Sequence, residues 1–251
     1  MRTKLLLFAA AIALSLAFIG CKGGNTPDDP SNGDTETADY SYTKKGGMYE
    51  VILKSGQRLY FCELVESIQL GDDKLCVINH GTYYKNNKDV DKPEYGYSGD
   101  VVIPSSLRLE GKEWIVYMVW EQAFADCSEL NSITLPNSVE KVDGYAFFRS
   151  TKLKRVSFGN HMVSLAGSAF QGCTSLAEII CYTPLPNKVE SQYYTVDKES
   201  YAYKYSFLMG ASEQDFSDVP LFKLYVPKNG VEAYKQDYWQ YVTSDILPIE
   251  E

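Results

Sequence analysis

Cysteine and histidine are the side chains best suited to covalent or metal chemistry, and their number and spacing limit what this chain can do. The chain has six cysteines but only two histidines, His80 and His161. Neither histidine lies in an H-E-x-x-H motif or beside a cysteine cluster, so a histidine-rich metal site is excluded. His161 follows the turn Gly159-Asn160 and is expected to be exposed. No motif therefore places a histidine where it could activate a cysteine nucleophile.

The cysteine spacing separates one possible disulfide from thiols that cannot pair. Cys62 and Cys76 flank a predicted turn and could pair across a hairpin, which the sequence alone leaves open. Cys127 and Cys173 occupy one position of a repeat described below, two copies apart. Two steps between strands about 4.8 Å apart exceed the roughly 7 Å limit for a disulfide. We therefore predict that these two, and Cys181, are buried thiols.

Acidic residues and glycine-rich loops offer the other common routes to catalysis, and the chain gives little sign of either. Asp89, Asp91 and Glu94 have a calcium-like spacing but lack the EF-hand pattern, so we interpret them as a solvated acidic loop. No G-x-S-x-G, G-x-x-x-x-G-K-[ST] or G-x-G-x-x-G motif is present. A carboxylate pair for glycoside hydrolysis needs only a spatial gap and stays open. We expect no enzymatic activity, no metal site and no cofactor.

Tyrosine is the residue type that stands out, with 20 in the chain. Residues 182–221 interleave tyrosines with Ser, Lys and Glu; they are Tyr182, Tyr193, Tyr194, Tyr201, Tyr203 and Tyr205. A connection this long is unusual and often functional. Tyrosine gives a large contact area at a low entropy cost, as in adaptable recognition surfaces. We predict a ligand-binding insertion; packing on the repeats as an elaborate cap is the alternative, and both roles can hold.

The overall charge argues against one class of partner. The chain has 33 acidic and 24 basic residues and a formal net charge of -9. Binding of a phosphate backbone needs a basic face, so nucleic acid is not expected as a partner. A hydrophobic content of 45% is that of a globular protein.

The N-terminus has the pattern of an export signal with a lipid site. A short positive segment, residues 1–4, precedes an almost wholly apolar run at residues 5–19, which is shorter than the roughly 20 residues that span a membrane. The segment Ala17-Phe18-Ile19-Gly20-Cys21 resembles a bacterial lipoprotein lipobox, with Phe18 in place of the usual Leu. The resemblance implies cleavage after residue 20 and a thioether lipid on Cys21. An ordinary secretory peptide is the alternative.

The segment after Cys21 is expected to be a flexible tether. Residues 22–39 are Gly, Asn, Asp, Pro, Ser, Thr and charged residues, with no large apolar side chain. Such a segment cannot bury enough surface to offset its ordering entropy. The tether of residues 21–39 would hold the folded body away from a membrane, and no other run approaches the length of a membrane span.

The middle of the chain repeats with a period of 23 residues. Three Ala-Phe pairs mark the period, at residues 123–124, 146–147 and 169–170. Further columns in the same register are Leu130, Leu153 and Leu176; Ile133, Val156 and Ile179; Leu135, Phe158 and Cys181; Cys127, Ser150 and Cys173; Val116, Val139 and Met162; and Val119, Val142 and Leu165. The L-x-x-I-x-L pattern alternates as in a short strand. Since one coil cannot bury its own apolar face, the coils must stack.

The repeat text resembles the leucine-rich repeats of the BspA-like family of bacterial surface proteins, whose unit reads A-F-x-x-C-x-x-L-x-x-I-x-L-P. Ser150 in place of Cys, and the lack of Pro after Phe158, depart from that unit. A degenerate earlier copy, with an insertion at residues 107–114, extends the repeats to residues 99–181. The resemblance implies a curved solenoid on the cell surface with a binding or adhesive role.

The two flanks of the repeats are predicted to cap them. Residues 40–98 show hairpin patterns and predict a small antiparallel sheet over the first coil. Residues 222–251 predict a closing strand and then a helix with Asn229 as its N-cap. Val231, Tyr234, Tyr238 and Val242 form one stripe of that helix.

Together these features predict a β-rich leucine-rich-repeat solenoid with a short parallel strand ladder, an antiparallel β N-terminal cap and an α/β C-terminal cap. We expect a lipid-anchored protein of the bacterial outer membrane or cell surface that binds an extracellular macromolecule as an adhesin or receptor. A glycan-binding accessory lipoprotein, and a structural or assembly lipoprotein without a soluble ligand, are the alternatives.

Overall fold

A computed structural model describes residues 39–45, 47–63, 73–79, 96–166, 168–186, 188–190, 222–237 and 239–250. The predicted signal sequence, Cys21 and the predicted tether up to residue 38 lie outside these residues. The described part is mainly β structure, with the two short helices α2 (Val231–Gln236) and α3 (Trp239–Val242) near its C-terminal end. Its strands fall into two sheets, called here the front sheet and the back sheet.

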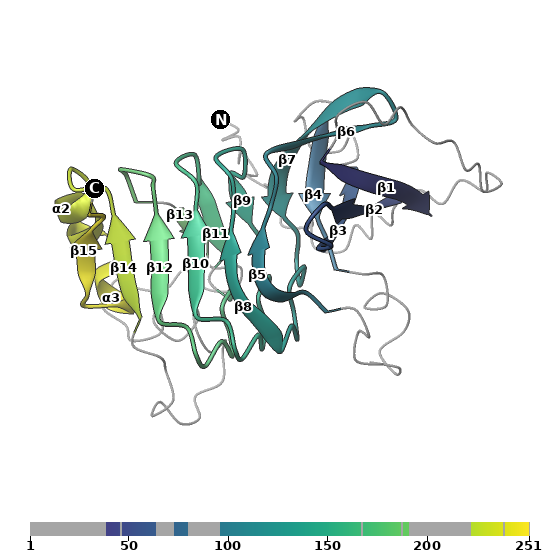
Figure 1. Cartoon of the computed structure of the whole chain (residues 1–251). Coiled ribbons are helices and arrows are strands. Elements are labelled where there is room, and N and C mark those ends of the chain that lie inside the picture. The colour runs from purple at the N-terminus through teal and green to yellow at the C-terminus, as the bar shows by residue number, and fades with distance from the viewer. Residues whose placement is uncertain are drawn as a thin grey trace, which may run out of the picture.

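The front sheet is a ladder of parallel strands in the spatial order β15-β14-β12-β10-β8-β5 (Figure 1). Its strands are β5 (Ser98–Val102), β8 (Glu129–Thr134), β10 (Arg155–Phe158), β12 (Glu178–Cys181), β14 (Lys223–Val226) and β15 (Ile246–Pro248). In the centre of the ladder, Val156 lies opposite Ile133 on one side and Ile179 on the other. Residues of one sequence column therefore become neighbours in space.

The back sheet changes from antiparallel to parallel along its length. Its order is β1-β2-β3-β4-β7-β9-β11-β13, with β6 paired to β7. Its strands are β1 (Tyr40–Lys45), β2 (Met48–Leu53), β3 (Arg58–Glu63), β4 (Lys74–Val77), β6 (Ser106–Leu109), β7 (Lys112–Val119), β9 (Lys141–Val142), β11 (Ser164–Ala166) and β13 (Lys188–Glu190). Pairing is antiparallel from β1 to β4 and parallel from β4 onward. In Figure 1, β9, β11 and β13 lie behind the front sheet, so each coil contributes to both layers.

The Ala-Phe segments close each coil through tight turns that also bond to the next coil. The amide of Phe124 donates to the carbonyl of Ala146 at 2.7 Å, and the amide of Phe147 donates to that of Ala169 at 2.8 Å. Each turn has a left-handed residue at the same place, namely Asp126, Arg149 and Gly172, with φ of 55°, 53° and 78°. The Ala-Phe segments, which form a third side of each coil beside the two sheets, are therefore also kept in register by hydrogen bonds between coils.

Stacked phenylalanines form the centre of the core. The ring of Phe147 lies between those of Phe124 and Phe170, with centroids 5.3 and 5.0 Å apart and interplanar angles of 12° and 3°. Tyr97 extends the stack toward the N-terminal sheet, with its centroid 4.5 Å from that of Phe124. All three phenylalanines are fully buried. The stack joins three successive coils and the segment that precedes them.

The Cys/Ser column of the repeat has a hydrogen-bonding role that explains the departure at Ser150. The Ser150 hydroxyl is fully buried and donates to the carbonyl of Phe124 at 2.6 Å. In the next coil, the Cys173 thiol donates to the carbonyl of Phe147 at 3.0 Å. A small donor is needed here because a buried carbonyl without a partner costs free energy. Either Ser or Cys meets that need.

Two sequence-based expectations on the C-terminal side differ from the structure. Asn229 is not the N-cap of α2: the cap position is Gly230, which makes no side-chain capping bond. Gly230 is required because a Cβ there would lie 2.5 Å from the carbonyl oxygen of Pro184. The single predicted helix is also divided at Asp237, whose extended backbone separates α2 from α3. The division brings Trp239 into the core beside Tyr234, with ring centroids 6.1 Å apart.

The predicted insertion at residues 182–221 contributes one strand to the back sheet. Strand β13 lies within it and pairs in parallel with β11, placing Val189 opposite Leu165. The earlier insertion at residues 107–114 falls in the β6–β7 hairpin, whose turn has Glu110 and Gly111 at φ of 52° and 76°. Both segments are thus attached to the back sheet.

The phenylalanine stack generates a first prediction. Phe147→Ala should lower the free energy of unfolding by about 3–5 kcal/mol, since a fully buried ring is lost from the middle of a stack. Urea denaturation followed by circular dichroism measures the change. Phe148→Ala is the matched control, because its half-buried ring lies outside the stack against Tyr145. Equal losses for the two variants would show that the stack has no special role.

Candidate ligand-binding surface

The outer face of the front sheet is a regular surface formed by six parallel strands. Alternate residues of each strand point into the core, leaving those between them outside. One outer row contains no charged residue, and we call it the neutral row: Val102, Thr134, Ser157, Ile180, Tyr225 and Leu247. All six side chains are exposed or half-buried. Val102, at 58%, is among the most exposed large hydrophobic residues of the described structure.

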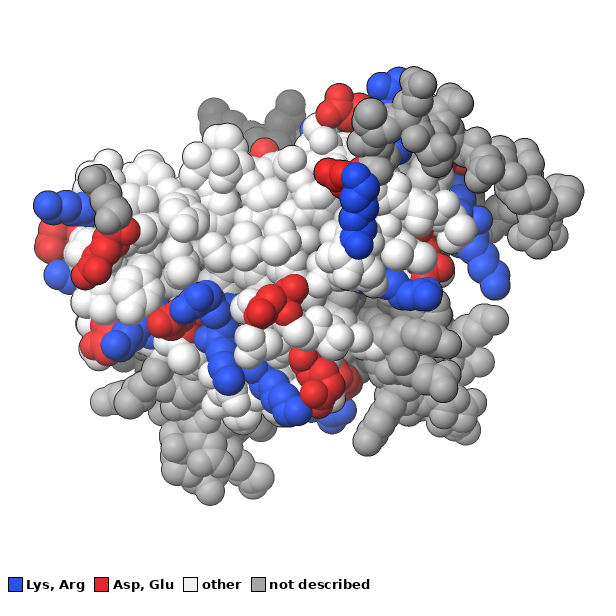
Figure 2. Space-filling view, in the orientation of Figure 1, with Lys and Arg blue, Asp and Glu red and all other residues white. Residues whose placement is uncertain are grey.

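A second outer row lies two residues earlier in each strand and carries the charges. We call it the charged row: Asp100, Ser132, Arg155, Glu178 and Lys223. Arg155 donates to Glu178 at 2.6 Å, and Ser132 donates to Asp100 at 2.5 Å. Figure 2 shows side chains of both charges gathered along the lower part of the face, below a broad uncharged band over β8, β10, β12 and β14.

The charges at this edge are largely satisfied by their neighbours. Hydrogen bonds from Ser132 and from Asn131 lower the pKa of the Asp100 carboxyl from its usual value. Further ion pairs join successive coils, Lys152 to Glu129 at 2.8 Å and Arg149 to Asp126 at 2.6 Å. The face therefore offers an uncharged contact area beside an edge of mutually paired charges.

A shallow depression of about 740 Å³ lies at the edge of the front sheet where β12, β14 and β15 end. It is lined by Tyr182, Pro227, Lys228, Asn229, Pro248, Ile249 and Glu250. Tyr182 directly follows β12, and its side chain is 47% exposed, so its ring is accessible to a ligand. The depression adjoins Tyr225 and Leu247 of the neutral row through the strands β14 and β15.

The structure places only one of the predicted site tyrosines. Tyr182 lies at the depression, whereas Tyr193, Tyr194, Tyr201, Tyr203 and Tyr205 fall outside the described residues. Cys21, His80 and the acidic loop at residues 89–94 also fall outside them. His161 is exposed in its turn as predicted, with a ring nitrogen 3.2 Å from the carbonyl of Asn137.

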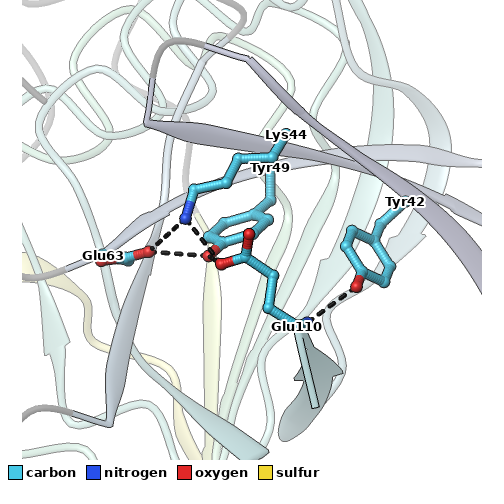
Figure 3. A network of polar contacts seen from close by, with 5 residues as sticks. All are labelled: Tyr42, Lys44, Tyr49, Glu63 and Glu110. Atoms are coloured by element: carbon cyan, nitrogen blue, oxygen red, sulfur yellow. Dashed lines mark hydrogen bonds and ion pairs between the residues drawn. The ribbon is translucent and has the colours of Figure 1, made fainter. Parts of the chain in front are cut away.

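A polar network at the N-terminal end is the densest charged cluster of the described structure (Figure 3). The Lys44 ammonium donates to Glu63 at 3.1 Å and to Glu110 at 2.7 Å. The Tyr49 hydroxyl lies 2.7 Å from Glu63 and 2.8 Å from Glu110, while Lys44 also lies over the Tyr49 ring at 4.8 Å. The network joins the β1–β2 hairpin to β3 and to the β6–β7 turn.

The protonation states in this network suit binding between the elements better than proton transfer. Burial, followed by the bonds to Glu63 and Glu110, raises the pKa of Tyr49 so that its hydroxyl stays protonated. Burial alone would lower the pKa of Lys44, but its bonds to the two carboxylates outweigh this and raise it. Burial alone would raise the pKa of Glu110, yet the bonds from Lys44 and Tyr49 lower it. Each group is held in its ordinary ionic form.

Two tyrosines of β1 cover the outer edge of β6. The amide of Arg108 donates to the Tyr40 hydroxyl at 2.5 Å, and the amide of Glu110 donates to the Tyr42 hydroxyl at 2.8 Å. The spacing of the tyrosines matches that of the amides, two residues in each case. An edge strand with unpaired amides can recruit another chain, so these hydroxyls protect the edge.

The thiols of Cys127 and Cys173, in the repeats, are buried. Burial raises the pKa of the Cys127 and Cys173 thiols to about 12. Among the described residues, no three or more His, Cys, Asp or Glu side chains gather in a way that could hold a metal ion. The same residues include no helix long and apolar enough to cross a membrane.

The comparison with protein families agrees with this geometry. Stacked coils with parallel ladders on two sides define a repeat solenoid. Residues 115–205 match the profile of the family described as "BspA type Leucine rich repeat region", in six copies. The chain thus carries a BspA-type leucine-rich repeat region, and the predicted resemblance and β-rich repeat fold are confirmed. Proteins with this repeat are generally non-enzymatic scaffolds and are typically associated with bacterial surfaces.

Solved structures of bacterial leucine-rich repeat proteins are similar to parts of the chain. A leucine-rich repeat protein of T. pallidum is 25% identical over 44% of this chain and 46% of its own, with a TM-score of 0.33. The chain thus spans about half the length of that protein. One from Bacteroides capillosus is 19% identical over 61% of this chain and 90% of its own, with a TM-score of 0.42. A leucine-rich cell surface protein of Faecalibacterium prausnitzii is 12% identical over 79% and 45%, with a TM-score of 0.42. No curated protein matches.

Sequence analysis did not identify the neutral row or the N-terminal network. The neutral row occupies the middle position of the I-x-L pattern, which holds Thr134 in one coil and Ser157 in the next. Its only signal is the absence of charge at that position. Lys44, Glu63 and Glu110 come from three separate segments with no shared spacing, so only the fold brings them together.

The network generates a prediction about acid stability. Glu110→Gln should lower the free energy of unfolding at neutral pH by roughly 0.5–1 kcal/mol, because half of the side chain is exposed and solvent screens its ion pair. The lowered pKa of Glu110 means that this contribution is present above its usual value of 4.5 and is lost as the pH falls through the folded-state value.

The difference between wild type and variant should therefore shrink as the pH approaches about 3. Urea denaturation at several pH values measures it. Glu113→Gln, on the same hairpin and exposed, is the control and should show little difference at any pH. A Glu110→Gln loss that does not depend on pH would contradict the assignment.

Proposed function

We propose that this chain is an exported, lipid-anchored bacterial surface protein that binds a macromolecular ligand, as an adhesin or receptor, through the outer face of its front sheet. The observation that carries the proposal is the neutral row, an uncharged strip across all six strands. An exposed strip with apolar members and a polar edge has the character of a protein interaction site.

The depression around Tyr182 supports the same face as the binding site. It extends the neutral row at the C-terminal end and adds an accessible aromatic ring beside Pro227 and Ile249. Tyrosine supplies both apolar area and a hydroxyl, which suits either a protein or a sugar. Tyr193, Tyr194, Tyr201, Tyr203 and Tyr205 remain proposed ligand contacts, since they follow β13 in the chain.

The remaining elements have supporting roles in this proposal. The 23-residue unit builds the scaffold, and its two ends need covers because each end coil exposes an apolar face. Strands β1–β4 serve as the N-terminal cap. At the other end α2, α3 and β15 serve as the C-terminal cap, burying Tyr234 and Trp239 completely.

Two other functions remain as alternatives. A glycan-binding accessory lipoprotein would use Tyr182 and Tyr225 as stacking platforms. A structural or assembly lipoprotein would use the same face for one membrane partner and would show no soluble ligand. Catalysis is not proposed, because the residues that line the depression include a single carboxylate, Glu250, and no thiol or imidazole.

Substitutions on the neutral row test the proposal. The chain from residue 21, with Cys21→Ser to prevent lipidation, is immobilised and exposed to mucin glycoproteins, serum proteins and polysaccharides. Val102→Asp and Tyr225→Ala should each weaken binding of a captured ligand by roughly tenfold or more, since each removes apolar contact from the face. Calorimetric titration with the purified protein or glycan measures the affinity and separates the first two functions.

Val163→Asp is the matched control. Val163 has nearly the same exposure as Val102, 54% against 58%, but precedes β11 of the back sheet. A second variant deletes residues 191–217, beginning after β13 so that the paired strand is kept. Ligand binding unchanged in Val102→Asp and Tyr225→Ala would eliminate the neutral row as the site. Loss only in the deletion would place the site in the tyrosine-rich segment.

The anchor is tested separately. Cys21→Ser in the producing bacterium should abolish incorporation of labelled fatty acid and release the protein from the membrane fraction, since the thioether needs the thiol. Cys62→Ser is the control and should leave labelling unchanged. Persistent labelling of Cys21→Ser would refute lipidation at this residue.

A further inference from the structure

We propose that Cys62 and Cys76 form a disulfide between β3 and β4 once the protein has left the cytoplasm. The two residues are directly opposite each other in the antiparallel pair. Their sulfur atoms are 2.9 Å apart, and the Cys76 sulfur lies 3.4 Å from the carbonyl oxygen of Cys62. This proposal concerns a covalent site and is independent of the ligand-binding face.

The backbone at this position already suits the bond. Residues directly opposite each other in an antiparallel pair have Cα atoms roughly 4.5–5.5 Å apart, within the 4.4–6.8 Å range found for disulfides. The sulfurs must approach by less than about 1 Å to reach bonding distance, which small side-chain rotations can provide. Cys127 and Cys173 differ because they lie two coils apart, and the Cys181 sulfur instead contacts the Tyr234 hydroxyl at 3.3 Å.

The bond would link the antiparallel and parallel parts of the back sheet. Strand β3 belongs to the antiparallel part, whereas β4 also pairs in parallel with β7 of the repeats. Among the described residues, β3 and β4 pair at Phe61, Cys62 and Glu63, and the Ile78 amide donates to the carbonyl of Tyr60 at 2.9 Å. Just beyond it the Tyr97 hydroxyl stands between the strands, accepting from the amide of Tyr60 at 3.1 Å and donating to the carbonyl of Ile78 at 2.7 Å.

The disulfide would link the two strands covalently in the middle of this pairing. The cysteines are 14 positions apart, so the bond would also restrict the unfolded chain by closing a loop. The bond would add to the backbone pairing and to the buried side chains of Leu59 and Phe61, which already join β3 to the repeats.

The exposure of the two thiols sets the order of the reaction. Cys62 is half-buried and therefore partly accessible from outside, whereas Cys76 is buried, with only 1% of its surface exposed. The Cys62 thiolate attacks an external disulfide, such as glutathione disulfide, and releases one thiolate. The Cys76 thiolate then attacks the mixed disulfide at the Cys62 sulfur and releases the second. Two thiols lose two electrons to the external disulfide, and their two protons pass to the departing thiolates.

The test uses the chain from residue 21 carrying Cys21→Ser, which retains the five other cysteines. The protein is equilibrated with glutathione disulfide, denatured, alkylated and weighed by mass spectrometry. We expect a disulfide between Cys62 and Cys76, with a mass lower by about 2 Da before alkylation, and alkylation of Cys127, Cys173 and Cys181 only. The oxidised protein should unfold at a temperature roughly 5–10 °C higher than the reduced protein.

Single variants provide the controls. Cys62→Ser should abolish both the mass change and the thermal shift, and Cys127→Ser should retain both. Cys62 is preferred to Cys76 for substitution because its side chain is not fully buried, and the wild-type measurement does not depend on either variant. Alkylation of all five cysteines after oxidation, or a link between any other pair, would overturn the proposal. Because the oxidant is supplied, this result is separate from whether the protein is exported.

Discussion

Each coil of this protein can bury its apolar side chains only against the coils beside it, and the rest of the structure depends on that contact. The ring of Phe147 packs on Phe124 and on Phe170 at nearly parallel angles. The side chain of Ser150 bonds to a carbonyl of the preceding coil, as does that of Cys173. Because the stacked rings occupy the same position in successive coils, Phe147 cannot change size without disturbing the packing of both neighbours.

This constraint also separates positions that hold the fold from positions free to recognise a ligand. The inward positions of the front strands, such as Ile133, Val156 and Ile179, are buried in the core, so a ligand on this face could contact only the outward positions. Thr134, Ser157, Ile180 and Tyr225 share one outward position yet differ in size and polarity. Such variation along a regular scaffold produces a surface specific to this chain without any change in the core.

The repeat and its core could be predicted from the sequence because the same physical demand recurs at fixed spacing. The neutral row, the N-terminal network and the break at Asp237 could not. Thr134 and Tyr225 share a row only through strand pairing, and Lys44 meets Glu110 only through the packing of two hairpins. Strand β13 could not be predicted from the sequence either, because its residues, Lys-Val-Glu, lack the L-x-x-I-x-L pattern. Local pattern predicts what periodic stacking requires, whereas contacts between unlike segments need the fold.

The ion pairs on the front sheet and in the segments beside it bear on what such a surface can recognise. Asp126 with Arg149, Glu129 with Lys152, and Glu178 with Arg155 are each joined at a separation of 23, so every pair spans two coils. An exposed ion pair contributes about 1 kcal/mol or less to the free energy of unfolding. Here the pairs also help to keep neighbouring coils in register. Charges already paired in this way attract a charged ligand only weakly across the neutral row. Recognition on this face would therefore rest on shape and on apolar and aromatic contact more than on charge.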